Sequence, residues 1–257
     1  MCTVVFLRRP GHAWPVLIAA NRDEMLDRPW LPPARHWPDR REVVAGRDEL
    51  AGGTWLGLND HGVVAGILNR QHSLGPAAGM RSRGELVLEA LDHADAAGAA
   101  AALAALDTRA YRPFNLVVAD NRDAYWLRNR GSDGPGRIET GRIPVGISMV
   151  TAHDLGDLAS PRIRVHLPRF QTAPPPDPDR GDWAAWEALL ASRDTEAGNQ
   201  SVESGPAAAM AIVTETGFGT VCGSLLALPS PEAYGRKPVW RFAPGLPGTV
   251  PWVDIRI

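Results

Sequence analysis

The pattern of apolar and polar positions predicts a block of β-strands over the first seventy residues. Residues 3–7 and 14–20 are apolar runs separated by a Pro-Gly turn signal, so they are expected to form a hairpin. A second hairpin is expected where residues 53–58 and 62–68 flank an Asn-Asp-His-Gly turn. Residues 28–41, rich in proline and tryptophan, are expected to form an irregular loop.

Helical and strand segments follow in blocks through the rest of the chain. Ser82 and Glu85 have the spacing of a capping box, and the apolar positions after them predict two helices. Residues 136–140 and 143–149 are expected to form a pair of strands. Further strands are expected at residues 114–119, 125–128, 209–214, 220–228 and 238–242, and further helices near residues 161–170 and 183–192.

The order of these blocks indicates the fold class. Strands and helices do not alternate strictly, as they would in a parallel sheet built from βαβ units. The order favours antiparallel sheets with helices packed outside them, which is an α+β layered fold. A length of 257 residues suits one domain, so we expect a single domain over residues 1–257.

Composition and charge exclude several classes of protein. The net charge is −2, from 27 basic and 29 acidic side chains, which excludes recognition of nucleic acid or anionic membranes by bulk charge. No run reaches the roughly 18 apolar residues of a membrane helix, so membrane insertion is not expected. Two cysteines and no secretory signal predict a cytoplasmic protein without a disulfide framework. The seven histidines are scattered, and no metal site is predicted.

Cys2 is the residue whose position suggests chemistry. A cysteine at the second position is small enough for Met1 to be removed, which would leave Cys2 with both a thiol and a free α-amine. The amine, with a reference pKa of about 7.7 to 8.0, can accept the thiol proton near neutral pH. A free cysteine at the start of a buried strand is also a common packing residue, and its position alone leaves both interpretations open.

Polar residues at the ends of two predicted strands add candidate partners for Cys2. Arg22 and Asp23 close the strand that pairs with the first one; the arginine can support a thiolate, and the aspartate can orient the α-ammonium group. Asn69 ends another apolar strand, where its side-chain amide can donate to a developing oxyanion. A solvated strand end and a capping amide are the structural alternatives for these residues.

Several motifs, in order along nearly the whole chain, resemble the NRDE-motif family, the relatives of the transport and Golgi organisation protein two. The motifs are Met1-Cys2-Thr3, Ala19-Ala20-Asn21-Arg22-Asp23-Glu24, Arg28-Pro29, Gly52-Gly53-Thr54-Trp55-Leu56-Gly57, Arg83-Gly84-Glu85-Leu86-Val87, Phe114-Asn115-Leu116 and Asn129-Arg130-Gly131. That family is in turn similar to cysteine N-terminal-nucleophile hydrolases such as choloylglycine hydrolase and penicillin V acylase. The resemblance implies their four-layer αββα sandwich.

The resemblance also implies roles for four residues. Cys2 would be the nucleophile and Arg22 would support its thiolate, while Asn69 and a backbone N–H would hold the oxyanion. Asp23 is the nearest candidate for the acidic partner of the amine, although the spacing at Asp23 is not that of the hydrolases. The expected function is that of an amidohydrolase or acyltransferase acting through Cys2 on a small-molecule substrate, a non-peptide C–N amide or a thioester.

A binding function on the same fold is the alternative. In it, the protein holds an apolar ligand (haem, lipid or acyl-CoA) without chemistry. No cofactor is expected for the enzyme, and haem is expected only under this alternative, with Cys2 or a histidine as its axial ligand. The residues involved in binding a cofactor, and the oligomeric state, stay open.

Two departures from the family pattern bear on the substrate. Met149 stands where the family usually has asparagine, and Val221 stands where it usually has arginine. If the polar residues bind substrate in relatives, this chain is expected either to bind a less polar substrate or to lack activity.

Overall fold

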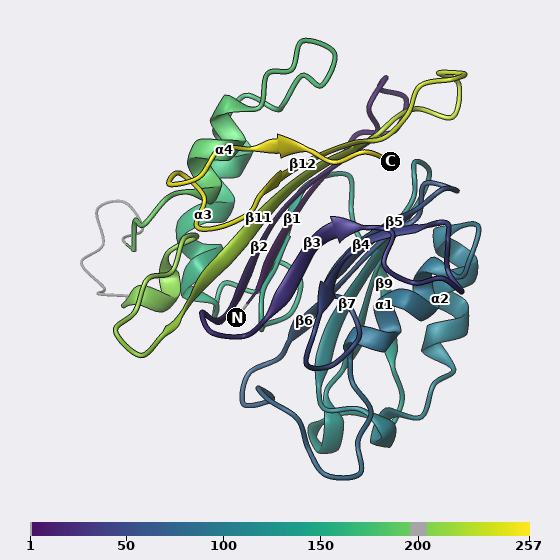
Figure 1. Ribbon diagram of the computed structural model, residues 1–257, viewed down its shortest axis with the longest axis vertical. Helices are drawn as coiled ribbons and strands as arrows, with labels where there is room; N and C mark the ends of the chain where they lie inside the picture. The colour runs from purple at the N-terminus through teal and green to yellow at the C-terminus, as the bar shows by residue number, and fades with distance from the viewer. Residues whose placement is uncertain (1, 196–204) are drawn as a thin grey trace.

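The structure, a computed structural model, describes residues 2–195 and 205–257. Two antiparallel sheets face each other, and a pair of helices covers the outer side of each (Figure 1). This arrangement is the four-layer αββα sandwich of an α+β protein, as the sequence predicts. None of the helices within the described ranges combines the length and apolar character needed to cross a membrane.

One sheet, called sheet A below, contains the N-terminal hairpin. Its strands are, in spatial order, β10 (Gly146–Val150), β1 (Thr3–Arg8), β2 (Val16–Met25), β11 (Phe218–Leu228), β12 (Val239–Ala243) and β13 (Val253–Asp254). The predicted hairpin of β1 and β2 is confirmed. Helices α3 (Pro161–Thr172) and α4 (Ala184–Leu190) cover the outer side of this sheet.

The other sheet, sheet B, follows chain order from edge to edge. Its strands are β3 (Trp30–Ala34), β4 (Val43–Asp48), β5 (Leu56–Asn59), β6 (Val64–Asn69), β7 (Phe114–Ala119), β8 (Ala124–Asn129) and β9 (Glu139–Arg142). Helices α1 (Gly84–Leu91) and α2 (Ala96–Ala104) pack on its outer side. Short 3-10 turns lie at Thr108–Ala110, Gly131–Asp133 and Pro206–Ala208.

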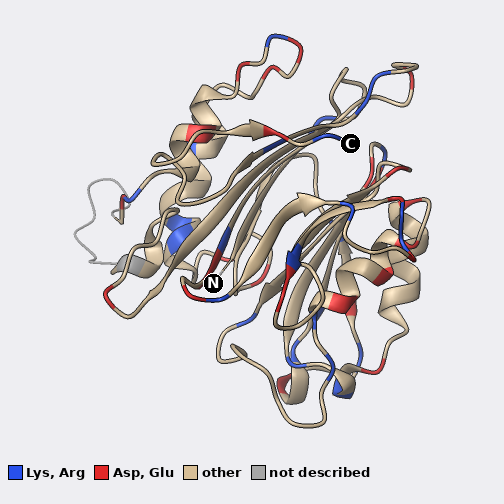
Figure 2. Ribbon diagram, viewed as in Figure 1, with Lys and Arg blue, Asp and Glu red and all other residues tan. Residues whose placement is uncertain are grey.

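The apolar residues form one core between the sheets and one under each pair of helices. Because side chains alternate across a strand, each central strand contributes to two of these cores. Most of both sheets is uncharged, with charged residues mainly in loops, helices and strand ends (Figure 2). The few charged side chains on the inner faces are therefore informative about function.

Two local predictions about the first half of the chain are wrong. Residues 28–41 are not wholly irregular, because β3 forms there. This strand lies at the edge of sheet B and has a register shift between Leu31 and Ala34. Edge strands of this kind tolerate proline. The capping box at α1 is also absent. The Ser82 hydroxyl accepts from the Gly84 N–H at 3.3 Å, and the Glu85 carboxylate pairs with Arg81 instead.

Two predictions about the second half also need correction. The strands near residues 136–149 do not pair with each other, because the chain crosses there from sheet B to sheet A: β9 pairs with β8, and β10 pairs with β1. Residues 209–214 are not a strand. Their backbone bonds other partners, since Ala211 donates to the Ser192 carbonyl and Ile212 donates to the Thr220 hydroxyl.

Candidate active site

The hydrogen-bonding register of sheet A brings the two cysteines of the chain to either side of Arg22. Thr3 pairs with Asn21, so continuing the register by one residue places Cys2 opposite Arg22. On the other side of β2, Arg22 pairs with Cys222 of β11, next to a bulge. Paired residues in a sheet point to the same face, so the three side chains form one row facing sheet B.

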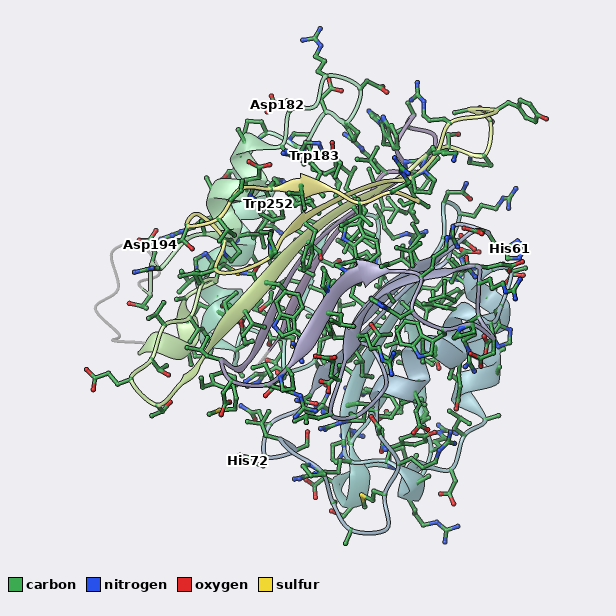
Figure 3. All side chains as sticks on the ribbon, viewed as in Figure 1. His61, His72, Asp182, Trp183, Asp194 and Trp252 are labelled. Carbon is green, nitrogen blue, oxygen red and sulfur yellow. The ribbon has the colours of Figure 1, made fainter. Side chains whose placement is uncertain are left out.

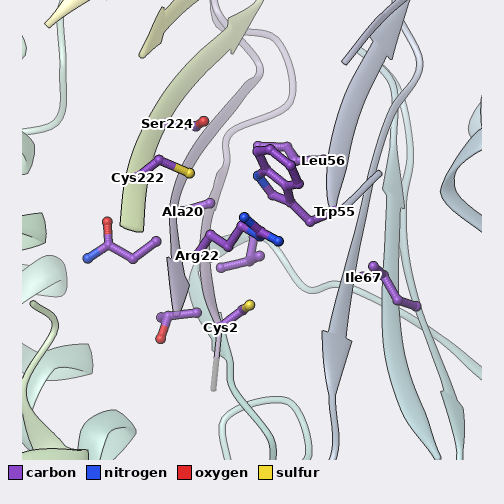
Figure 4. A pocket seen from close by; sticks show the side chains of 11 residues that line it. Cys2, Ala20, Arg22, Trp55, Leu56, Ile67, Cys222 and Ser224 are labelled. Atoms are coloured by element: carbon purple, nitrogen blue, oxygen red, sulfur yellow. The ribbon is translucent and has the colours of Figure 1, made fainter. Parts of the chain in front are cut away.

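A small pocket lies between the sheets at this row (Figure 4). It is lined by Cys2, Thr3, Val4, Ala20, Asn21, Arg22 and, from the other strands, Trp55, Leu56, Ile67, Cys222 and Ser224. Figure 4 shows the Arg22 guanidinium between Trp55 and the Cys2 sulfur. The pocket thus joins a thiol and a cation within largely apolar walls.

Arg22 crosses the gap between the two sheets. Its Nη2 donates to Asp48 Oδ2 of β4 at 3.0 Å, and its guanidinium lies 4.2 Å from the centre of the Trp55 ring. The residue is only 5% exposed, and its Nη1 has no hydrogen-bond partner in residues 2–195 and 205–257. A buried donor without a partner is costly, and a bound oxygen atom would satisfy it.

Asp48 is the centre of a charged cluster that holds Arg22 in place. Its carboxylate accepts from Arg28 Nε at 2.7 Å and from the backbone of Leu50 and Ala51. Burial opposes ionisation of this carboxyl, but the hydrogen bonds from Arg28 and Ala51 outweigh it and keep its pKa below the usual range. Asp48 is therefore an anion that compensates the charge of Arg22.

The Cys2 thiol is protonated at neutral pH in this arrangement. Burial raises the pKa of the Cys2 thiol and the Asp23 carboxylate adds to the rise, while the Arg22 cation opposes it. The Sγ atom lies 3.9 Å from the backbone carbonyl oxygen of Asp23, which accepts its weak hydrogen bond. A reaction at Cys2 consequently needs a base to take the proton.

Asp23 points its side chain away from the pocket. It follows Arg22 on β2, so its carboxylate lies on the opposite face of sheet A, toward the helices. There it accepts from Arg162 Nη1 of α3 and from the Thr220 hydroxyl, each at 2.7 Å. Arg162 also donates to the Thr3 hydroxyl, and the Asp23–Arg162 pair is 0% exposed. The backbone carbonyl of Asp23 is the group that contacts the Cys2 sulfur.

Asn69 is the predicted residue that the structure does not bring to the thiol. It is the last residue of β6 and pairs with Phe114. Within the described part of the chain it does not line the pocket and makes no hydrogen bond with Cys2, Arg22 or Asp23. Ile67, two residues earlier on the same face of β6, does line the pocket.

The two family departures lie outside the pocket. Met149 is fully buried in the core under α3 and α4. Val221 occupies the bulge between Thr220 and Cys222 and packs with Phe242. Neither apolar side chain lines the space around Cys2, so neither changes the polarity of the pocket itself.

Sequence reasoning missed Trp55 and Ser224 as pocket residues and Asp48 as the partner of Arg22. A signal for Trp55 was present, since it stands in a motif with glycines on either side. A Cβ atom on Gly46 would lie 2.3 Å from the Trp55 ring, so the glycine allows the indole to lie against β4. Nothing in the sequence near Asp48 indicates its partner, because Arg22 lies 26 residues away in the other sheet.

The described residues hold no group of three or more His, Cys, Asp and Glu side chains that could bind a metal ion. His61 and His72 lie at the periphery of the molecule, as Figure 3 shows. His166 is buried among the helices, and its Nε2 donates to the Asp194 carbonyl, 3.1 Å away. The chemistry available in the pocket is therefore that of the Cys2 and Cys222 thiols, the Arg22 guanidinium and the Ser224 hydroxyl.

Comparison with protein families gives a match over the first two thirds of the chain. The family model described as "Transport and Golgi organisation 2" matches residues 1–168. A human transport and Golgi organization protein 2 homolog is 32% identical over 148 residues, which is 52% of this chain and 52% of the human protein. The bovine homolog is 34% identical over 128 residues, 47% of this chain and 45% of its own length. The chain thus matches about half the length of these relatives.

Solved structures with the same fold are N-terminal-nucleophile hydrolases. An N-acylethanolamine-hydrolyzing acid amidase ortholog from Caenorhabditis elegans has a TM-score of 0.51 at 10% identity, covering 87% of this chain and 92% of that one. Penicillin V acylase from Agrobacterium tumefaciens has a TM-score of 0.50 at 14% identity, with 99% and 86% covered. A mutant conjugated bile acid hydrolase from Clostridium perfringens has 0.51 at 10%, with 99% and 92% covered. At these identities the likeness shows the fold alone.

Proposed function

This chain belongs to the transport and Golgi organisation 2 family, and we propose that it is an amidohydrolase or acyltransferase that acts through Cys2 on a small-molecule amide or thioester. The observation that carries the proposal is the pairing of the Cys2 thiol with the buried, unpartnered Arg22 Nη1 in one pocket. A nucleophile and a free donor at the same place are what acyl transfer requires. The amidase and acylase activities of the fold neighbours are consistent with it.

The first chemical step is attack of the Cys2 sulfur on the substrate carbonyl carbon. Once Met1 is removed, the α-amine of Cys2 takes the thiol proton, and the new C–S bond pushes the carbonyl electrons onto oxygen. Arg22 Nη1 supplies a donor for a substrate oxygen, and its charge stabilises the thiolate form of Cys2. The family pattern would make the Asn69 amide a second oxyanion donor, but in the structure Asn69 does not line the pocket.

The second step releases the leaving group and then the acid. The ammonium group of Cys2 returns its proton to the departing amine or thiolate as the C–N or C–S bond of the substrate breaks. Water, deprotonated by the same amine, then attacks the acyl-cysteine, and the thiol is restored as the carboxylic acid leaves. Asp23, fixed by Arg162 and Thr220 beside the backbone of Cys2, serves as the acidic partner that orients the amine.

The charge balance around Arg22 indicates what its Nη1 binds. Asp48 already compensates the guanidinium, so the spare nitrogen suits a neutral carbonyl oxygen better than a second full anion. This matches an amide or thioester substrate rather than a free carboxylate.

The intact mass of the full chain purified from its native host tests the first requirement. The proposal predicts that the mass lacks the initiator methionine. Turnover of amides and thioesters is then compared between the wild type and Cys2→Ala, with release of amine or thiol as the readout. Equal turnover by the two proteins would remove Cys2 from the reaction. Retention of Met1 would instead favour binding of an apolar ligand without chemistry.

A further inference from the structure

Four asparagines of the described chain share one hydrogen-bonding pattern. Each is at most 1% exposed, and its side-chain Nδ2 donates to the carbonyls of two residues outside its own strand. They are Asn21, Asn59, Asn115 and Asn129. Three of them hold segments on the helix side of their own sheets, at the ends of α4 and α1 and at the turn before β7. Asn115 of β7 is different, because its partners Thr151 and His153 follow β10 of the opposite sheet.

The stretch that Asn115 holds, residues 151–153, lies beside the start of β1. Strand β10 is at the edge of sheet A, and its Val150 pairs with Val4 of β1. Residues 151–153 follow β10 directly, so continuing the antiparallel register places Ala152 beside Cys2. Strand β2 lies on the other side of β1. The backbone of residues 151–153 is thus the second flank of Cys2.

Sheet B bonds all three carbonyls of this stretch. Asn115 Nδ2 donates to the Thr151 carbonyl at 2.9 Å and to the His153 carbonyl at 2.7 Å, one on each side of Ala152. The Ala152 carbonyl accepts from the backbone N–H of Gln71 at 3.3 Å. Buried carbonyls need a partner, so loss of the Asn115 bonds would allow the stretch to move in search of others.

The Asn115 side chain is itself held in one orientation. Its Oδ1 accepts from Arg70 Nη1 at 2.7 Å and from Trp126 Nε1 at 3.2 Å. Arg70 also donates to Asp154 Oδ1 at 2.7 Å, immediately after the stretch. Two donors on the oxygen and two carbonyls on the nitrogen use the hydrogen-bonding capacity of the amide within the protein. Asn115 is therefore suited to holding its neighbours rather than to contacting a substrate.

The reaction proposed above needs the start of β1 to be held in place. In that reaction the α-amine of Cys2 takes the thiol proton, and a misplacement of about 1 Å can cost a factor of about 100 in rate. On the β2 flank, the Asp23 carbonyl accepts from the Cys2 thiol at 3.9 Å. We propose, on the basis of the function proposed above, that Asn115 is a positioning residue, which keeps residues 151–153 against β1 and thereby fixes the backbone that carries the amine.

Serine substitutions at Asn115 and Asn129 form a matched pair for the test. Serine is uncharged and has a single donor on a shorter side chain, so each variant loses an amide that joins two carbonyls. Asn129 is as buried as Asn115, but its partners Thr108 and Tyr111 lie on the helix side of sheet B, away from Cys2. Urea denaturation should show a loss of stability in both variants. Only Asn115→Ser should also impair the reaction.

Thioester turnover by the full chain is the first readout. With acetyl-N-acetylcysteamine, Asn115→Ser is expected to lower kcat/KM at least about tenfold, mainly through kcat, because the amine loses its place while the substrate contacts stay. Asn129→Ser is expected to stay within about twofold of the wild type. Asn115→Asp and Asn129→Asp, which keep the shape of the side chain, replace this pair if the serine variants do not fold. An equal fall in both folded variants, or no fall in the folded Asn115 variant, would overturn the positioning role.

Hydrogen exchange is the second readout, and it does not depend on turnover. Amide exchange in β1, measured by mass spectrometry under native conditions, should become at least about tenfold faster in Asn115→Ser and stay unchanged in Asn129→Ser, with β12 as the internal reference. Unchanged exchange of β1 in the folded Asn115 variant would overturn the proposal. Absence of turnover in the wild type would overturn the proposed function instead, and the exchange of β1 would still decide whether Asn115 holds it.

Discussion

Two ion pairs lie on opposite faces of strand β2, and they differ in whether they border the pocket. Arg22 faces the other sheet, pairs with Asp48 and keeps Nη1 without a partner beside the pocket. Asp23, the next residue, faces the helices, where both of its carboxylate oxygens already accept hydrogen bonds from Arg162 and Thr220. The first pair presents a donor to the pocket beside a thiol, and the second lies on the other face of the strand, with its side chains 0% exposed.

The difference shows how consecutive polar residues of one motif acquire separate roles. Alternation along a strand sends neighbours to opposite faces, so the side chains of Arg22 and Asp23 pair with different residues despite their adjacency. A fully buried pair contributes modestly to net stability, but removing one partner is costly because the other charge is left behind. Substitutions on the helix side should thus affect folding, and substitutions on the pocket side should affect reactivity.

The largest effect is expected from breaking the buried pair. Arg162→Met removes the Arg162 cation from the Asp23 carboxylate at a site with 0% exposure, and should lower the free energy of unfolding by about 3–5 kcal/mol. Urea denaturation measures the loss. Arg142→Met, which removes an exposed pair with Asp123, is the control and should change stability little. A loss of the same small size in both variants would contradict the comparison.

The stability of the fold should also decrease in acid, because of a histidine among the helices that cover sheet A. Burial, with help from Arg169, lowers the pKa of His166 to about 4, so the folded protein holds this imidazole neutral. The unfolded chain protonates it near 6.5, and stability is therefore lost as the pH falls from about 6.5 toward 4, by about 3 kcal/mol in full. His166→Gln should flatten this part of the stability profile. A profile of identical slope in the variant would show that other groups cause the loss.

On the pocket side, Arg22→Lys should impair the reaction more than the fold. An ammonium group can replace the contact with Asp48 but not also present a second donor to the substrate. The expected result is a fall of roughly a hundredfold in kcat/KM for a thioester, with less destabilisation than in Arg162→Met. Steady-state kinetics and urea denaturation of the same preparation measure both. A drop in stability without a drop in kcat/KM would reverse the assignment of the two faces.

The smallest effect is expected at the thiol itself. Asp48→Asn removes the anion that compensates Arg22 and Arg28, so the uncompensated cations should lower the pKa of Cys2. Glu24, Asp23 and Arg83 also act on this site and are unchanged in the variant. The pH dependence of Cys2 alkylation by iodoacetamide measures the pKa of the Cys2 thiol. Asp60→Asn, in the exposed pair with Arg35, should leave it unaltered.

Local pattern was enough to predict antiparallel sheets with helices outside them and the hairpin that carries the site, whereas the four-layer order was implied by the family resemblance. The apolar runs of β1 and β2 are long, and the turn between them is well marked, so the neighbourhood of Cys2 and Arg22 followed from the sequence. The strand predicted at residues 209–214 failed because the segment meets β11 only in an isolated bridge at Val213, while the N–H groups of Ala211 and Ile212 bond the Ser192 carbonyl and the Thr220 hydroxyl. Periodicity carries no information about such partners.

The contacts between layers could not be predicted from the sequence. Asp48 reaches Arg22 only because two separate sheets face each other, and Arg162 reaches Asp23 from a helix 139 residues away. The bulge between Thr220 and Cys222 shifts the register of β11, which decides whether Cys222 and Ser224 or their neighbours face the pocket. Asn69 was predicted from its place at a strand end, but the structure does not bring its amide to the thiol.

The most direct test is the location of an acyl group after a single turnover. The full chain is mixed with acetyl-N-acetylcysteamine, quenched in acid and analysed by tandem mass spectrometry of its N-terminal peptide. We predict one acetyl group on the sulfur of Cys2 in a peptide that lacks Met1. Cys222→Ala should also form this adduct, because its Cys2 is intact. Cys2→Ala should form none. Acetyl found on Cys222, or an unmodified Cys2 while thiol is released, would contradict catalysis by Cys2.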